Sequence, residues 1–187
     1  LTWFSQHDAG KLGVGSFGRI QRLCWHLDNL ISKRTQVKGK RKRRLKLAEN
    51  RMRHRIRDLI DELHWKSARW LVDNYDIILL PSFETSQMAC AGKLRSKSVR
   101  MLMSFAHYRF QNRLVGKAFE AGKRVEIVNE AYTSKTASWT GEIKAIGSAR
   151  TICSGGVRVD RDINGARGIF LRALRDSASL RTAFVNQ

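Results

Sequence analysis

Proline is nearly absent from this sequence of 187 residues, which has only one, Pro81. Long Pro-rich linkers are therefore not expected. Apolar runs are short too, and none approaches the ~18 residues of a membrane-spanning helix. Residues 1–13 lack the basic start and apolar run of a secretory signal, and the first residue is leucine, as in a processed or excerpted sequence. No membrane location is predicted.

Cysteine is scarce as well. The three cysteines, Cys24, Cys90 and Cys153, are far apart and odd in number, which excludes the disulfide framework of a small secreted domain. This usage indicates a reducing compartment. We expect an intracellular protein, and a nuclear one if the host is eukaryotic.

Acidic residues are the third shortage, with 16 Asp and Glu against 36 Lys and Arg, a net charge of +20. Such a chain repels itself unless a polyanion lies close to it. Nucleic acid is the favoured partner because arginine forks match phosphate oxygens. An anionic membrane surface and an acidic protein are the alternatives.

The positive charge is concentrated in residues 38–57, which hold eleven Lys or Arg and one acid, Glu49. A solvated helix face would mix both signs at spacings of four residues. We therefore predict that this segment follows a phosphate backbone, and a nuclear-localisation role is compatible with that. The predicted nucleic-acid contacts here are Lys40, Arg41, Lys42, Arg43, Arg44, Arg51 and Arg55.

Hydrophobic periodicity predicts an α/β fold with a mixed sheet. Residues 1–15 indicate one or two short strands, and 16–72 indicate two long helices broken at Gly39. The remaining predictions are a buried, parallel strand at 76–80, a helix at 98–121, a strand at 125–128, an inserted loop or ribbon at 133–158 and a helix at 162–175.

Five tryptophans could stack on bases. Trp25 and Trp70 fall in apolar helical patterns and are predicted to be core residues. Trp139 lies in the polar insertion and is the better stacking candidate.

Two short motifs carry the acids of a candidate site. NEAYTSKT, residues 129–136, places Glu130 at the carboxyl end of a strand, where α/β sheets form their sites. DRDINGARGI, residues 160–169, places Asp160 and Asp162 at the start of a helix. Helix capping is the simple interpretation of these two acids. Metal coordination is the functional one, because two Mg²⁺ ions that cut a phosphodiester need several converging carboxylates.

The two motifs, in this order and with a cysteine before the second, resemble the C-terminal signature of the Fanzor and TnpB proteins, transposon-associated relatives of type V CRISPR effectors. WLVDNYDIILLPSFETSQM and SKSVRMLMSFAHYRFQNRL resemble the eukaryotic and viral branch. The resemblance implies a RuvC-like domain of RNase H-like fold that cuts target DNA under the direction of a guide RNA. It also implies a two-metal Mg²⁺ site that includes Glu130 and Asp162, with Asp160 as a helper or a cap. Lys135 and Arg161 would contact nucleic acid.

The family pattern is incomplete in two places. No D-P-G-like first strand is found, so the first central strand is apparently missing, and Asp8 is a poor substitute for its catalytic acid. Of four zinc-ribbon positions, Ala137, Thr140, Cys153 and Gly156, only Cys153 is a thiol. Zinc binding is therefore not expected, and Cys153 is predicted to be a small buried hydrophobe.

Three regions follow from the resemblance. Residues 1–132 form a first RuvC-like part that includes the basic helices at 16–72, residues 133–158 form a degenerate zinc-ribbon-like insertion, and 159–187 form the final RuvC-like segment. The main hypothesis is the C-terminal part of an RNA-guided endonuclease, partial or decayed, and its enzymatic activity stays uncertain. The alternative is a non-catalytic nucleic-acid-binding protein derived from such a nuclease. Oligomeric state is left open.

Overall fold

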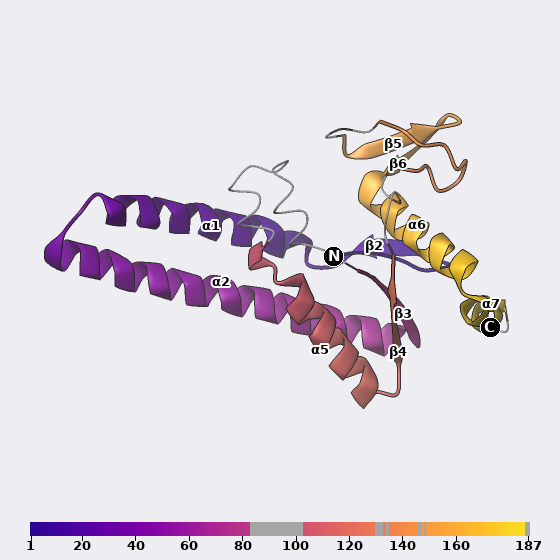
Figure 1. Ribbon diagram of the computed structural model, residues 1–187, viewed down its shortest axis with the longest axis horizontal. Coiled ribbons are helices and arrows are strands. Elements are labelled where there is room, and N and C mark those ends of the chain that lie inside the picture. Colours follow the sequence, from indigo (N-terminus) through magenta and orange to yellow (C-terminus); the bar gives the residue numbers. More distant parts are fainter. Residues whose placement is uncertain (83–102, 130–132, 134, 146, 148, 186–187) are drawn as a thin grey trace. The chain divides into compact units, whose positions relative to one another are not determined.

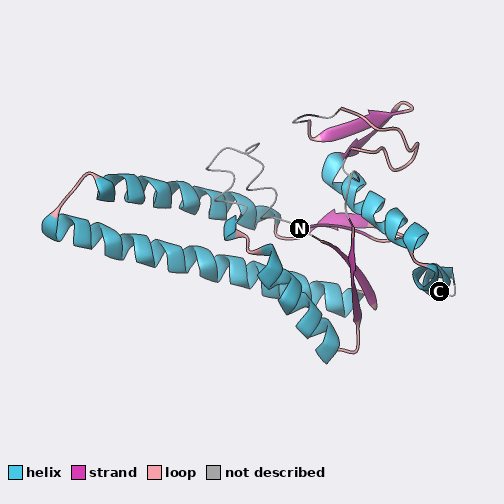
Figure 2. Cartoon of the chain, viewed as in Figure 1, coloured by secondary structure: helices cyan, strands magenta, loops and turns pink. Residues whose placement is uncertain are grey.

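The computed structural model describes residues 1–82, 103–129, 133, 135–145, 147 and 149–185. These residues belong to two compact units. A helical unit contains Gly13–Asn74 and the described residues up to Lys117, and a strand-containing unit contains Leu1–Leu12, the segment from Tyr75, and Ala118 onward. The α/β class is confirmed (Figure 2).

The helical unit is built on two long helices, α1 (Val14–Thr35) and α2 (Gly39–Asn74), which run side by side (Figure 1). Gly39 has a φ of 59°, a left-handed conformation that glycine adopts without strain, so the predicted break is confirmed. Apolar side chains at spacings of three and four residues face each other between the helices. The buried core consists of Ile20, Cys24, Leu27, Ile56 and Ile60.

Helix α5 (His107–Glu120) is shorter than the predicted helix at 98–121, whose first five residues lie outside the described ones. The chain turns at Ala106, which has a φ of 46°. The ring of Phe105 stacks on Phe17 at 5.9 Å, and its carbonyl accepts a hydrogen bond of 2.9 Å from His64 Nε2. These tertiary contacts hold Phe105 against α1 and α2, so the helical pattern is interrupted just before His107.

The strand-containing unit has a parallel pair, β3 (Ile77–Pro81) and β4 (Arg124–Val128), with Ile78 opposite Val125. This confirms the predicted strands and their parallel orientation. A hairpin of β1 (Thr2–Phe4) and β2 (Ala9–Lys11) forms at the start of the chain. A second hairpin, β5 (Thr151–Ser154) with β6 (Val157–Asp160), lies in the insertion.

Helix α6 (Arg161–Asp176) follows β6 directly and packs on β1, where the rings of Phe4 and Phe170 lie 5.7 Å apart. A further helix, α7 (Ala178–Val185), was not predicted. The described strands form three separate two-stranded sheets, so the expected single mixed sheet is not present among them. Within the described ranges, no helix has both the length and the apolarity needed to cross a membrane.

Candidate functional site

The predicted phosphate contacts lie on the N-terminal half of α2. All seven side chains are exposed, and none of them forms an ion pair with another described residue. Over residues 14–74 the hairpin has seventeen Lys or Arg against six Asp or Glu. These seven residues of the first half of α2 are therefore unpaired cations in contact with solvent, as a phosphate-binding surface requires.

The one acid within this basic segment is buried. Glu49 is 6% exposed and joins the two helices. It accepts hydrogen bonds from Arg34 Nε of α1 at 2.8 Å and from Arg53 of α2 at 2.8 and 3.1 Å. The hydrogen bond from Arg53 is the largest cause that lowers the pKa of Glu49. Glu49 is thus ionised and links α1 to α2 through these two arginines. It does not pair with the seven exposed cations named above.

A second charged cluster attaches α5 to α2. Asp61 accepts hydrogen bonds from Arg109 at 3.0 Å and Arg113 at 2.8 Å. The guanidinium of Arg113 also lies 5.2 Å from the ring centre of Trp65. Burial, chiefly, lowers the pKa of the neighbouring His64 to about 4. This histidine is therefore neutral near pH 7. It has a structural role, because its Nε2–H donates a hydrogen bond to the carbonyl of Phe105.

The two acidic motifs are brought together by Asn164 of α6, which is 1% exposed. Its amide nitrogen donates to the carbonyl of Thr136 at 2.8 Å and to that of Thr133 at 3.4 Å, and its oxygen accepts from Ser138 N at 2.9 Å. A Cβ placed on Gly168 would lie 3.1 Å from the Cβ of Thr133. Asn164 and Gly168 therefore fix the 133–138 segment against α6, a role that sequence reasoning did not assign to them.

Asp160 and Asp162 have different surroundings. Asp160 is the N-cap of α6, where its Oδ1 accepts from the backbone N of Asp162 at 2.9 Å and of Ile163 at 3.3 Å. Its other oxygen binds Lys11 Nζ at 2.8 Å, the chief reason for its lowered pKa. Asp162 is 62% exposed, and its nearest cation is Arg161 at 3.9 Å. Of the two, only Asp162 presents a carboxylate that is open to a metal ion.

The remaining predicted site residues are only partly located. Glu130 lies outside the described residues. Lys135 is exposed, and Arg161 donates to the carbonyl of Gly147 at 3.4 Å. Asp8 is a turn residue of the β1–β2 hairpin, and its Oδ1 accepts from the backbone N of Ala9 at 2.7 Å. In the described part of the chain, no three His, Cys, Asp or Glu side chains gather closely enough to hold a metal.

Where the family has its zinc-ribbon cysteines, this chain has a hydrogen-bonded group of polar side chains next to a buried alanine. Ala137 is fully buried, and Thr140 Oγ1 lies 2.8 Å from Ser154 Oγ. The Ser154 hydroxyl also lies 2.7 Å from Glu142 Oε2, and Glu142 pairs with Lys144. Since Ala137, Thr140 and Gly156 offer no thiolate, the donor set does not fit a tetrahedral zinc site.

Cys153 was predicted to be buried, and this is wrong, because its residue is exposed in β5. Alternate residues of a strand face opposite sides, and here Ile152 and Ser154 take the buried side.

The core predictions for two tryptophans also need correction. Trp25 is 52% exposed rather than part of the core, and Trp70 is only partly buried. Trp139 is held in the insertion by a hydrogen bond of 3.0 Å from its Nε1 to the carbonyl of Ser154. This bond fixes one edge of the indole, and base stacking by Trp139 stays a prediction.

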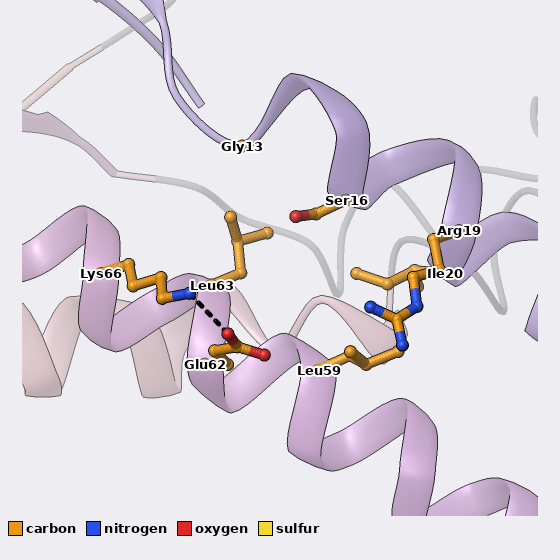
Figure 3. Close-up of a pocket in the computed structure, with 8 residues that line it drawn as sticks. All are labelled: Gly13, Ser16, Arg19, Ile20, Leu59, Glu62, Leu63 and Lys66. Carbon is orange, nitrogen blue, oxygen red and sulfur yellow. Dashed lines mark hydrogen bonds and ion pairs between the residues drawn. The ribbon is translucent and has the colours of Figure 1, made fainter.

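A cavity of about 280 Å³ lies between the start of α1 and the second half of α2 (Figure 3). Ile20, Leu59 and Leu63 supply its apolar wall. Glu62, the one acid that lines it, is already paired with Lys66 at 2.6 Å. The cavity therefore holds no free carboxylate for metal chemistry.

Comparison with known proteins shows similarity in the part of the chain that contains the two acidic motifs. Residues 107–169 match the family described as Cas12f1-like, TNB domain. A protein described as a transposase of Paramecium bursaria Chlorella virus 1 is 35% identical over 162 residues, which is 83% of this chain and 35% of that protein. A TnpB-like protein of Acanthamoeba polyphaga mimivirus is 29% identical over 153 residues, 80% of this chain and 29% of its own length.

A further relative is the CRISPR-associated endodeoxyribonuclease Cas12f1 of Sulfoacidibacillus thermotolerans, 30% identical over 133 residues, 69% of this chain and 31% of that protein. The chain spans about a third of the length of each of these relatives. The segment that matches the family contains both acidic motifs and the β5–β6 hairpin.

Proposed function

Since the chain belongs to the TnpB family of transposon-associated nucleases, we propose that it supplies the RuvC-type catalytic portion of an RNA-guided, magnesium-dependent DNA endonuclease. Its partners are then a guide RNA and the target DNA. The strand-containing unit would have the RNase H-like fold, a proposal supported by the parallel β3–β4 pair and by α6 packed beside the strands.

The observation that carries this proposal is the contact between the two acidic motifs. Asn164 donates to the carbonyls of Thr133 and Thr136, so the segment that follows Glu130 lies against the helix that bears Asp162. A buried amide with all of these bonds made fixes backbone positions tightly. The described residues that follow Glu130 and the helix that bears Asp162 thus share one scaffold, which supports the proposal that the two acids serve one metal site.

The proposed roles differ between the acids. Glu130 and Asp162 would each give a carboxylate oxygen to Mg²⁺, which would neutralise charge on the scissile phosphate and lower the pKa of an attacking water. Asp160 is a positioning residue, because both of its oxygens are bound to Lys11 and to the start of α6. A third carboxylate completes a site of this kind, and the cleavage test below decides whether these 187 residues supply it.

Nucleic acid would be held mainly by the first half of α2. Its free cations contact phosphates without reading sequence, which suits a protein whose specificity comes from guide pairing. The logarithm of the binding constant falls as the logarithm of the salt concentration rises. Each phosphate contact makes this fall steeper by about 0.9 for duplex DNA. The seven exposed residues named above therefore predict a steep salt dependence.

A second candidate function is nucleic-acid binding without cleavage. The capping role of Asp160 favours it, because it leaves Asp162 as the only available acid of the second motif.

Cleavage of labelled single-stranded DNA with Mg²⁺ tests the first proposal. The chain is compared with Glu130→Ala, Asp162→Ala and Asp160→Asn, and each protein is also titrated with the same DNA at several salt concentrations. The nuclease proposal predicts that cutting is lost in Glu130→Ala and Asp162→Ala while their binding and helix content are unchanged. Asp160→Asn keeps a capping oxygen and should keep most of the activity.

The alternative outcome is equally informative. If the chain binds tightly and loses affinity steeply with salt but cuts nothing, the binding function stands and the chemistry requires other sequence. If it neither cuts nor binds, both proposals are wrong.

A further inference from the structure

One face of α1 points away from the core and carries a large aromatic ring. Trp25 is 52% exposed although its sequence neighbour Cys24 and the nearby Leu27 are buried. With 3.6 residues per turn, Trp25 is about 100° to 160° around α1 from Ile20, Cys24 and Leu27, so it points away from the side that they share. The ring therefore does not contribute to the hairpin core.

The residues within one turn of Trp25 on this face are polar. Gln21 and Arg22 precede it by four and three residues, and Asp28 and Asn29 follow it at three and four. Arg22 and Asn29 are exposed, as is Lys33 eight residues after Trp25, whereas Gln21 and Asp28 are partly buried. Neither Arg22 nor Lys33 forms an ion pair with any described residue. Arg22 and Lys33 are eleven residues apart, which corresponds to about 17 Å along the helix axis. Within one turn of Trp25 the face thus has one planar apolar surface. Arg22 lies before it, Lys33 lies beyond it, and Asp28 is the one acid beside it.

The composition of this face distinguishes between kinds of partner. A protein partner that docks on a helix uses several apolar anchors on one face, whereas here Trp25 is surrounded by charged and amide side chains. The same arrangement fits a polyanion with planar groups. A base can stack on the indole while Arg22 and Lys33 bind the phosphates on either side of it.

A double helix does not offer such a base, because its bases are already stacked on one another. An unpaired base costs no unstacking of a duplex. The hairpin also presents its free cations beyond Lys33, on the first half of α2, so a single strand could continue from this face onto that surface.

We propose that Trp25 is a base-stacking site for an unpaired nucleotide of single-stranded RNA or DNA, with Arg22 and Lys33 as phosphate contacts beside it. The proposal rests on the proposed function in one respect, since the chain must bind nucleic acid. It adds the segment of nucleic acid that is recognised, which is an unpaired one, and the residue that distinguishes it from a duplex.

The test measures binding of the full 187-residue chain to fluorescein-labelled oligonucleotides by anisotropy. The probes are a mixed-sequence single-stranded RNA, the corresponding single-stranded DNA and a DNA duplex of equal length. Trp25→Ala and Trp25→Leu remove the aromatic plane, and Leu keeps part of the apolar area. Trp25→Phe keeps a ring. Tyr108→Ala, which removes an exposed aromatic residue of α5, is the matched control.

Loss of one stacked base costs about 5-fold to 160-fold in affinity. We expect this loss for Trp25→Ala and Trp25→Leu on single strands, a small loss for Trp25→Phe, and no change on the duplex or for Tyr108→Ala. The salt slope should stay as in the parent, because no charge is removed. Comparison of the RNA and DNA probes identifies which single strand is bound more tightly. Arg22→Ala and Lys33→Ala should each make the salt dependence of single-strand binding shallower by about 0.7 in the same slope.

Three outcomes overturn the proposal. Trp25→Ala could bind single strands as the parent does, it could lose duplex affinity equally, or Trp25→Leu could bind as well as Trp25→Phe. A parent chain that binds none of the three probes would instead refute nucleic-acid binding itself, and the stacking proposal with it. Far-UV circular dichroism of each variant shows whether the helices are intact, and Trp25 is expected to be neutral there because it lies outside the core.

Discussion

Replacement of Glu49 tests what holds the basic hairpin together. The carboxylate is 6% exposed and receives hydrogen bonds from Arg34 on one helix and Arg53 on the other. Removal of one member of a buried ion pair costs about 3–5 kcal/mol, because a charge is left without its partner. Here the partners left behind can reach water, since the side chains of Arg34 and Arg53 are 27% and 50% exposed.

The expected cost is accordingly below that range. We expect about 2 kcal/mol for Glu49→Ala and about 1 kcal/mol for Glu49→Gln, which keeps an oxygen that accepts one charged hydrogen bond. Urea unfolding followed at 222 nm measures the change, because α1 and α2 are the two longest helices described. Glu62→Gln is the matched control, since its pair with Lys66 is exposed on both sides, and no measurable shift is expected.

The same contact predicts a pH dependence. Chiefly because of the hydrogen bond from Arg53, the folded-state pKa of Glu49 lies below its ordinary value of 4.5. The unfolded chain therefore binds this proton first as the pH falls. The stabilisation is present above pH 4.5 and is lost as the pH decreases below that value. In Glu49→Gln this part of the pH dependence should be absent. An unchanged unfolding midpoint in Glu49→Gln, or an equal shift in Glu62→Gln, would refute the reasoning.

Three further predictions concern other contacts. His64, whose pKa is lowered from 6.5 to about 4 mainly by burial, should contribute a stability loss of up to roughly 3 kcal/mol as the pH falls from 6.5 to 4; an NMR titration of its ring with a midpoint near 6.5 would contradict this. Asp160→Ala should destabilise α6 by about 1 kcal/mol through loss of its N-cap, whereas Asp162→Ala should leave the thermal midpoint nearly unchanged. Ser154→Ala should lower the thermal midpoint because Thr140 and Glu142 lose their common partner. EDTA should have no effect on that midpoint, and a decrease with EDTA would show that a metal stabilises the fold.

Local patterns in the sequence were sufficient for the two long helices and the parallel strand pair. The α1–α2 hairpin follows from apolar spacings of three and four residues with a glycine between the helices. The β3 and β4 strands follow from short apolar runs that are closed by Pro81 and by a polar motif. Such signals are contained within a few turns of chain, so tertiary structure did not need to be known.

The errors arose where tertiary contacts decide. Ala106 ends a helical pattern because Phe105 is held by Phe17 and His64. Trp25 has helical spacing from apolar neighbours, yet the α1 core is completed by Cys24 and Leu27. The role of Asn164 depends on carbonyls about thirty residues earlier in the chain. A single sequence contains no signal for that pairing beyond the presence of an amide near the start of a helix.

The division of the chain into two units has a consequence for the order of folding. The helical hairpin is one continuous segment, Gly13–Asn74, so its contacts close over short distances in sequence. The strand-containing unit is assembled from three separated segments. β3 can pair with β4 only after β4 has been synthesised, and β4 begins more than forty residues later, at Arg124. Contacts that close long loops form slowly. During synthesis on the ribosome, the strongly cationic hairpin should therefore be folded, and open to any polyanion nearby, before the acids of the second motif have been translated.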